Sequence, residues 1–328
     1  MAFTLARLDL DPTNVGLVYV SASEPGWTRK PHGRGFTYMD ERGKTLRGEK
    51  RSRAEALVLP PAWQDVWICK LANGHLQATG RDEAGRTQYR YHADWRAHCE
   101  HVKFSDMLAF GEALPRLRAQ VKRVLDDPED LIALATAAIV RMLDKGAIRV
   151  GSQRHAANGT FGASTLYKRH VRQTAEDTLR LKFKGKGGRQ QEVSICDESL
   201  ARAVAELQCL PGQALFGTPD GQVGSRQVNR FIQEASGGAF TAKDFRTWGG
   251  SVAAVEALRK GADSIKAISE AAAAHLGNTP TIARNSYIHP QLIEMARDKQ
   301  KPEELSGPMR LKKDERRLFA VLESARDA

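Results

Sequence analysis

Five short segments of the sequence concentrate side chains that could bind and act on a phosphate group. They combine arginine, lysine, a carboxamide or tyrosine with glycine or other turn residues, and they cover residues 147–151, 184–188, 241–249, 275–280 and 283–290. A site without metal ligands must neutralise an anionic transition state with side chains, and arginine, lysine and a hydrogen-bond donor suit that task. The five segments are therefore candidate parts of a metal-free site.

The usual motifs of other phosphate-handling and hydrolytic enzymes are absent from the sequence. It has no GxxxxGK[ST] phosphate loop, no HExxH or GxSxG motif and no calcium-binding loop. The four cysteines form no CxxC pair, and they are Cys69, Cys99, Cys196 and Cys209. We interpret them as reduced thiols of an intracellular protein. We expect neither a bound metal ion nor another cofactor, and no obligatory small-molecule ligand.

The charge distribution indicates an anionic partner. The chain has 328 residues and a formal net charge of +11, which favours nucleic acid, an acidic membrane surface or an acidic protein. Residues 147–190 contain ten lysines and arginines against two acidic residues, and residues 29–53 form a second basic stretch. Each stretch alone is typical of a solvated face, but two such stretches would suit a clamp around a polyanion.

The first hundred residues have the alternating pattern of β-strands. Residues 35–46 predict a hairpin with glycine in its turn. Residues 66–71 and 75–79 flank an Asn-Gly pair, which is a strong hairpin signal. Residues 88–92 alternate large and polar side chains. The pattern predicts a small, mainly β domain.

After about residue 100 the apolar residues recur at helical spacing. Asp197 and Asp263 are expected N-caps. One strand pair, at 178–184 and 191–195, interrupts the helices around a glycine-rich turn. The predicted helices cover residues 129–145, 198–207, 225–235, 242–260 and 263–276.

The change of pattern near residues 96–103 predicts two domains. The fold class is α+β, with a β-rich domain at 1–97 and a larger, mainly helical domain at 98–328. The first nine residues lack the apolar core of a signal peptide, and the apolar run at 131–140 is too short to span a bilayer. We therefore expect a soluble cytoplasmic protein.

The candidate segments form an ordered set of motifs. The sequence reads IRVGS at 148–152, KGKGG at 184–188, KDFRTWG at 243–249 and GNTPTIARNSY at 277–287. In order and spacing they resemble the catalytic domain of type IB DNA topoisomerases, especially the poxvirus enzyme and its bacterial relatives. The viral patterns are IRxGK, VGKDK, KDLRTYG and GHTPSISKRAY. The segment GRDEAGRTQYRY at 80–91 is similar to the viral GSDSKGRRQYFY, so the resemblance extends over both predicted domains.

The resemblance implies a fold and a reaction. The expected fold is the catalytic domain shared by topoisomerases IB and tyrosine recombinases, joined to the β-rich domain in a clamp around duplex DNA. The expected activity is relaxation of supercoils by transient cleavage of one strand, without ATP or metal. A monomer associated with the nucleoid is the implied form.

The resemblance also implies catalytic roles for five residues. Tyr287 matches the nucleophile that forms a 3′-phosphotyrosyl bond, and on its own it would be an ordinary core tyrosine. Arg149 and Arg246 match the arginines that hold the non-bridging phosphate oxygens. Lys186 matches the general acid for the leaving 5′-oxygen. Asn278 departs from the viral histidine, because an amide can donate a hydrogen bond but cannot carry charge.

Further residues are implied to contact DNA, and two alternatives stay open. Lys182 and Lys184 compete with Lys186 for the role of acid. Pro290 is expected to end or bend the helix that carries the nucleophile. The expected DNA contacts are Tyr89, Arg90, Tyr91, Lys184 and Lys243.

The alternatives are a tyrosine recombinase and a non-catalytic DNA-binding protein with a decayed site. Recombinases usually have HxxR where this chain has Lys243 three residues before Arg246. They also more often have a helical domain where this chain has strands. The presence of the whole residue set argues against decay.

Overall fold

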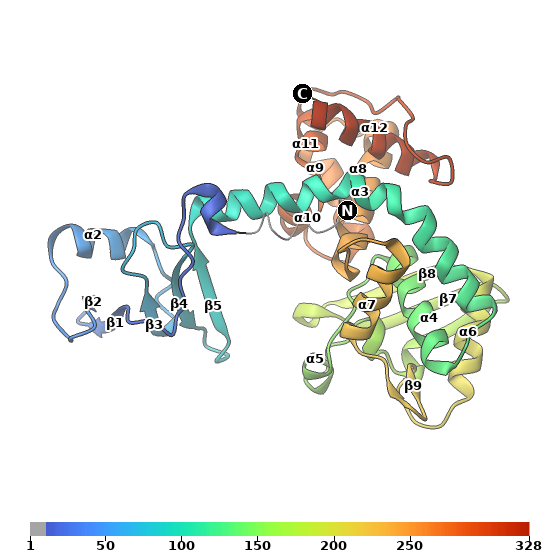
Figure 1. Ribbon diagram of the computed structural model, residues 1–328, viewed down its shortest axis with the longest axis horizontal. Helices are drawn as coiled ribbons and strands as arrows, with labels where there is room; N and C mark the ends of the chain where they lie inside the picture. The colour runs from blue at the N-terminus through green and yellow to red at the C-terminus, as the bar shows by residue number, and fades with distance from the viewer. Residues whose placement is uncertain (1–10, 328) are drawn as a thin grey trace. The chain divides into compact units, whose positions relative to one another are not determined.

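The computed structural model describes residues 11–327. They form two compact units, which divide between Phe104 and Ser105. Helix α3 (Ala93–Asp126) begins in the first unit and ends in the second (Figure 1). The predicted fold class, a small β-rich part followed by a larger, mainly helical part, is confirmed. The segment considered as a signal peptide lies outside the described residues. Among those described, no helix has the length and apolar character needed to cross a membrane.

The first unit contains one five-stranded antiparallel sheet of order β2-β1-β3-β4-β5. The predicted pairing of residues 66–71 with 75–79 is confirmed, since Ile68 pairs with Ala78. A short helix, α2 (Gly48–Ala56), and a 3₁₀ turn, η1 (Pro12–Val15), complete the described part of the unit. The strands are β1 (Trp27–His32), β2 (Gly35–Met39), β3 (Gln64–Ile68), β4 (Leu76–Arg81) and β5 (Thr87–Tyr91).

The hairpin predicted at 35–46 is present, but it is short. Met39 and Thr45 form an antiparallel bridge, and the Leu46 amide donates to the Tyr38 carbonyl at 2.8 Å across the turn. The longer partner of β2 is β1, and this pairing was not predicted from the sequence. It was missed because β1 contains Pro31 and charged residues, which give it a weak strand signal.

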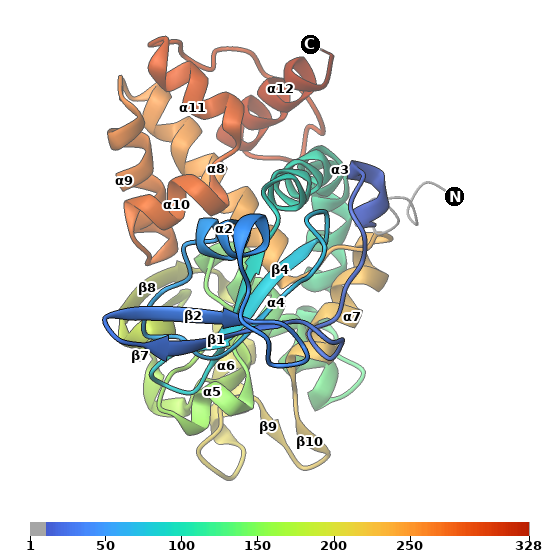
Figure 2. The ribbon, with the colours of Figure 1, turned by 90° about the vertical axis from the view of Figure 1, so that its left-hand side faces the viewer.

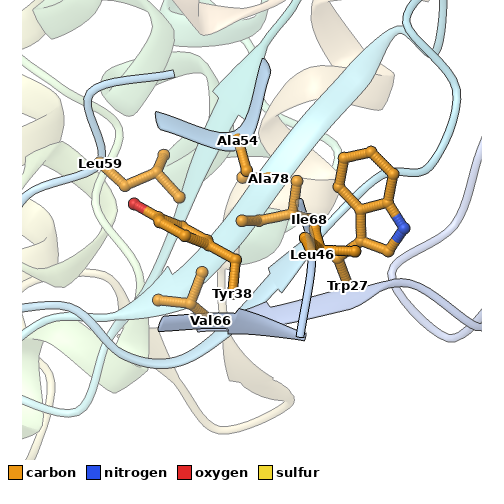
Figure 3. Packing of buried hydrophobic residues seen from close by; sticks show 8 residues of the cluster. All are labelled: Trp27, Tyr38, Leu46, Ala54, Leu59, Val66, Ile68 and Ala78. Atoms are coloured by element: carbon orange, nitrogen blue, oxygen red, sulfur yellow. The ribbon is translucent and has the colours of Figure 1, made fainter. Parts of the chain in front are cut away.

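The core of the first unit lies between the sheet and helix α2. Figure 3 shows Tyr38 of β2 and Val66 and Ile68 of β3, which form one apolar cluster with Ala54 of α2. Buried Arg29 closes one side of this core, because its guanidinium donates to the carbonyl oxygens of the chain around residues 59–63. Burial of these apolar groups stabilises the packing of the sheet against α2. The edge strand β5 is held by its antiparallel pairing with β4.

The second unit contains a three-stranded antiparallel sheet of order β6-β7-β8, against which α4 and α6 pack. Helices α8, α9, α10 and α11 form one neighbouring group (Figure 2). The helices are α4 (Leu131–Gly146), α5 (Gln153–Ala157), α6 (Glu198–Cys209), α7 (Ser225–Ser236), α8 (Ala242–Arg259), α9 (Ile265–Leu276), α10 (Pro280–Tyr287), α11 (Pro290–Arg297) and α12 (Lys313–Asp327). The strands and 3₁₀ turns are β6 (Val171–Ala175), β7 (Thr178–Lys184), β8 (Gln190–Cys196), β9 (Gly217–Thr218), β10 (Gly221–Gln222), η2 (Ala163–Thr165), η3 (Lys168–His170) and η4 (Lys186–Gly188).

The five predicted helices correspond to α4, α6, α7, α8 and α9, with ends that differ by a few residues. The Asp197 cap is confirmed, since its side chain accepts from the Leu200 amide. The Asp263 cap is wrong, because the Ser264 hydroxyl accepts from the Ala267 amide and α9 begins one residue later. Helix α10 ends at Tyr287 and Pro290 starts α11, as the proline predicted.

Candidate active site

Arg246 lies at the centre of the candidate active site and connects the ends of two helices. It sits in the second turn of α8, which begins with a capping box in which the Asp244 carboxylate accepts from the Thr241 amide and hydroxyl. Its side chain is buried, with 3% of the residue exposed. One Nη donates to the Ala147 carbonyl and the other donates to the Leu276 carbonyl at 3.1 Å. Arg246 therefore holds the end of α4 and the end of α9 at one place.

The segment that carries Arg149 follows the left-handed end of α4. Ala147 has a φ of 46°, which turns the chain away from the helix axis and points its carbonyl at Arg246. The next residues run beside η2, whose Ala163 amide donates to the Arg149 carbonyl at 2.8 Å. A Cβ atom on Gly162 would lie 2.5 Å from that carbonyl oxygen, so only glycine permits this approach. The backbone of Arg149 is thus fixed on both sides.

Tyr287 is the last residue of α10 and is held against α8 by its backbone. The Ser251 hydroxyl donates to the Tyr287 carbonyl at 3.0 Å and accepts from the His289 amide at 3.1 Å. A Cβ atom on Gly250 would lie 3.0 Å from both Cβ and the carbonyl oxygen of Tyr287. The small residues at 250 and 251 therefore let the tyrosine backbone approach α8. These two positions were not predicted from the sequence, where their one distinguishing feature is that they follow the KDFRTWG motif.

The Tyr287 ring lies under the Arg246 guanidinium, whose central carbon is 4.9 Å from the ring centroid. Burial alone would raise the pKa of the Tyr287 hydroxyl. The charge and hydrogen bond of Arg246, with smaller effects from Arg149 and Lys243, outweigh burial and lower that pKa. Arg246, Arg149 and Lys243 therefore all lower the pKa of the Tyr287 hydroxyl, and all four residues were predicted from the sequence.

Arg149 also acts on Arg246. Burial is the largest cause that lowers the pKa of Arg246, and the positive charge of Arg149 is the next. The two positive charges repel each other, so an anion bound near both would stabilise the arrangement.

Asn278 follows the left-handed Gly277 that ends α9. Its side-chain oxygen and nitrogen are both buried without a hydrogen-bond partner, and so is Nε of Arg246. Buried polar atoms in native proteins are rarely left unpaired. These atoms therefore mark a place where a ligand with hydrogen-bonding oxygens would be favourable.

Lys186 lies at the tip of the hairpin between β7 and β8, within η4. Its side chain is exposed, as are those of Lys182 and Lys184. Gly187 and Gly188 both have positive φ, near 74° and 75°, which closes the turn tightly. The Gly185 amide donates to the Arg189 carbonyl at 2.7 Å across the hairpin. Lys186 is not among the charges that act on the Tyr287 hydroxyl.

The candidate DNA-contact residues of the first unit lie on the edge strand β5. Tyr89 and Tyr91 stack with ring centroids 6.0 Å apart and are 55% and 38% exposed. Arg90 is exposed between them. Tyr19 was not predicted as a DNA contact. It is 71% exposed, and its ring stacks on the His75 ring with centroids 4.7 Å apart. The His75 ring centroid lies 6.1 Å from that of Tyr91. Tyr19 and His75 therefore extend the row of neighbouring rings beyond Tyr89 and Tyr91, the two tyrosines of the QYRY motif.

In the second unit Lys243 is exposed on α8. Within residues 11–327, no group of three or more His, Cys, Asp and Glu side chains is placed to hold a metal ion. The phosphate-binding candidates near Tyr287 are thus arginine, lysine and amide side chains.

Comparison with known proteins identifies the family. Residues 92–307 match the family model of the eukaryotic DNA topoisomerase I catalytic core, and residues 35–82 match the bacterial DNA topoisomerase IB N-terminal domain. A DNA topoisomerase 1B of Acanthamoeba polyphaga mimivirus is 29% identical over 265 residues, which cover 74% of this chain and 79% of the viral protein. The first match contains all five predicted catalytic positions, whereas Tyr89 to Tyr91 fall between the two matched ranges.

The chain belongs to the type IB DNA topoisomerases. It is therefore an enzyme that acts on DNA and relaxes supercoils. The resemblance drawn from the motifs is confirmed. The match to a bacterial topoisomerase N-terminal domain decides against the recombinase alternative, and membership of an enzyme family decides against the non-catalytic one.

Proposed function

We propose that the enzyme relaxes duplex DNA by cutting one strand through Tyr287 and forming a 3′-phosphotyrosyl intermediate, without ATP or a metal ion. The observation that carries the proposal is the contact between Arg246 and Tyr287, which lowers the pKa of the hydroxyl that would attack. A lowered pKa makes the phenolate, the stronger nucleophile, available nearer neutral pH. The phenol proton leaves to water, and the phenolate oxygen bonds to phosphorus.

Arg149, Arg246 and Asn278 would hold the non-bridging oxygens of the scissile phosphate. The phosphate would lie between the two guanidinium charges and remove their mutual repulsion. It would also supply acceptors for the buried Nε of Arg246 and the Asn278 amide nitrogen, which have no partner in the structure. Donors already in place cost little reorganisation when charge develops in the transition state.

Lys186 would protonate the leaving oxygen. As the bond from Tyr287 to phosphorus forms, the bond from phosphorus to O5′ breaks and the Lys186 ammonium gives its proton to O5′. An alkoxide is a poor leaving group, so a placed proton donor speeds the step. An exposed position on a glycine-rich turn suits a residue that must reach into bound DNA. Resealing reverses these steps, so bond energy is conserved and no ATP is needed.

Contacts outside the reacting phosphate would come from both units. Lys184 at the end of β7 and Lys243 on α8 are exposed cations, and Tyr89, Arg90 and Tyr91 form an exposed strand edge. Backbone contacts of this kind give affinity without sequence preference. We further propose domains at 1–97 and 98–328, closure around duplex DNA as a monomer, no obligatory small-molecule ligand, and association with the nucleoid.

Relaxation of supercoiled plasmid in EDTA, without ATP, tests the proposal. Wild type should relax plasmids of either supercoil sign, and Tyr287→Phe should be inactive, although it keeps the ring under Arg246. Failure of wild type at low salt and excess enzyme would overturn the metal-free mechanism, and so would relaxation by Tyr287→Phe.

A further inference from the structure

The side chain of Gln191 fills the space between two glycines of the candidate active site. Gln191 lies on β8, just after the turn that carries Lys186, and is 8% exposed. A Cβ atom on Gly185 would lie 2.8 Å from Gln191 Cγ, and one on Gly277 would lie 1.9 Å from Gln191 Oε1. Gly185 immediately precedes Lys186, and Gly277 immediately precedes Asn278. One side chain therefore contacts the neighbours of two proposed catalytic residues.

The Gln191 amide also ties the hairpin to the loop that carries Asn278. Its Nε2 donates to the Gly277 carbonyl at 3.1 Å, across 86 residues of sequence. Gly277 has a φ of 59° and ends α9 by donating its amide to the Ala273 carbonyl. The Leu276 carbonyl, one residue earlier, accepts from Arg246. The hydrogen bond of Gln191 thus attaches the hairpin to the same helix end that Arg246 holds.

The rest of the hairpin tip is held by hydrogen bonds of its own backbone and has no buried side chain. Residues 186–190 are all exposed, and Gly187 and Gly188 add backbone freedom. On the other strand, the Phe161 amide donates to the Lys184 carbonyl at 2.7 Å. Gln191 is the first buried side chain after the turn. It is therefore placed to decide where the turn lies relative to Asn278.

We propose that Gln191 is a positioning residue that sets where Lys186 delivers its proton. The inference rests on the function proposed above. A displacement of about 1 Å in a reacting group can cost roughly 10²-fold in rate. Loss of the hydrogen bond to Gly277 would let the hairpin shift and leave the proton donor misplaced. DNA binding, which depends on many contacts, would change little.

Single-turnover cleavage of a duplex oligonucleotide tests the inference. Gln191→Ala should cleave a normal substrate about 10- to 100-fold more slowly than wild type, with unchanged DNA affinity. In a second substrate, sulfur replaces the 5′-bridging oxygen, and the departing thiolate needs no proton. On that substrate Gln191→Ala and Lys186→Ala should both cleave at the wild-type rate. If Gln191→Ala stays slow on the sulfur substrate, Gln191 does not act through Lys186 and the proposal is wrong.

Two further variants separate positioning from folding. Gln191→Met keeps the volume between the glycines but cannot donate to Gly277, so it should also be slow on the oxygen substrate and recover on sulfur. A wild-type rate for Gln191→Met would overturn the role of the hydrogen bond. Gln190→Ala, at an exposed neighbour on the same strand, should match wild type. Melting temperatures of all variants show whether each is folded at the assay temperature.

The failure of this inference can be distinguished from failure of the proposed function. If wild type forms no covalent adduct with either substrate, the proposed function is wrong. If wild type forms the adduct and sulfur rescues Lys186→Ala, but Gln191→Ala is as fast as wild type on oxygen, only the inference about Gln191 is wrong.

Discussion

The two sides of the candidate active site differ in how firmly the structure holds them. Arg246, Tyr287 and the Asn278 amide are buried or half-buried. The Arg246 side chain donates to the carbonyl at the end of α9, and Ser251 of α8 donates to the Tyr287 carbonyl. Lys186 lies exposed on a turn with two left-handed glycines. The proposed phosphate-binding side is thus ordered in the absence of DNA. The proposed proton donor, Lys186, lies on a turn that contacts the rest of the unit through the strands at its base.

This difference suits the chemistry proposed for each side. Charge stabilisation works best when donors do not have to reorganise, which favours burial. A proton donor must approach an oxygen that belongs to bound DNA, which favours a hairpin that can adapt. Substitutions on the buried side should therefore affect both activity and stability, and those on the hairpin should affect activity alone.

The largest expected effect is that of Arg246→Ala. It removes a phosphate contact and also the bridge between the Ala147 and Leu276 carbonyls, so cleavage should fall by roughly 10³-fold, the upper end for one such donor. The melting temperature should also fall, because buried carbonyls lose their partner. Arg246→Lys should recover little, since an ammonium cannot serve both carbonyls in the same geometry. Single-turnover cleavage and thermal unfolding measure the two effects, and full activity in Arg246→Ala would contradict this account.

Lys186→Ala should slow cleavage by roughly 10²- to 10³-fold, within the range for general acids. Because the side chain is exposed, the melting temperature should not change. Lys184→Ala and Lys182→Ala serve as matched controls on the same hairpin, with smaller effects. If the 5′-bridging sulfur substrate rescues Lys184→Ala and not Lys186→Ala, the acid has been assigned to the wrong lysine.

Asn278→Leu should slow cleavage by roughly 10- to 10²-fold, because it removes the amide donor while keeping a similar volume. Asn278→His should retain most of the activity, since imidazole can also donate. It should add a dependence on pH near the pKa of histidine, with faster cleavage below it, where the ring is charged. Cleavage rates across pH check both variants. Equal rates for the leucine variant and wild type would show that position 278 donates nothing to the phosphate.

Gly250→Ala should slow cleavage by a smaller factor and lower stability by about 1–3 kcal/mol, the usual cost of overpacking. The added methyl would meet Leu276 Cδ1 at 2.9 Å and push the Tyr287 backbone away from α8. Gly224→Ala serves as the control, because the added methyl lies in open space. Gly43 is not used for this purpose, because its positive φ would strain any substituted residue. Chemical denaturation and cleavage rates are the measurements. Unchanged values for Gly250→Ala would mean that the close approach is not needed.

The smallest effect concerns pH. The pKa of Tyr287 is lowered, so cleavage should rise with pH and level off below the ordinary pKa of tyrosine, near 10. Lys243→Gln removes the weakest of the three cationic contributions, so the midpoint should move slightly to higher pH. Rates are measured at saturating DNA, since Lys243 is also a candidate DNA contact. A midpoint that moves to lower pH would contradict the electrostatic argument.

The sequence predicted the identities of the candidate residues better than their supports. Motif order predicted Arg149, Arg246 and Tyr287, and the structure brings these three together. It could not predict that Arg246 would donate to carbonyls 99 and 30 residues away, because such partners are set by tertiary packing and any residue type has a carbonyl. The contact of Gln191 with Gly277 was invisible for the same reason.

Secondary structure followed the same pattern. Helices with strong apolar spacing, such as α4 and α6, were predicted. Helix α3 was not, because Pro115 lies inside it and is a helix-breaking signal, although the buried apolar residues of α3 recur at spacings of three and four. The pairing of β2 with β1 was missed because a glycine turn signal does not reveal every strand that pairs with β2. Local signals predict elements, and pairing depends on the rest of the fold.

The most direct test of the central claim traps the covalent intermediate. Wild-type enzyme is mixed with duplex DNA in EDTA, denatured with detergent, and digested, and the DNA-linked peptide is identified by mass spectrometry. The account predicts a peptide that contains Tyr287 joined to the 3′-phosphate of the cut strand, with a free 5′-hydroxyl on the other fragment. An adduct on another residue, a 5′-phosphate linkage or an adduct formed by Tyr287→Phe would contradict it.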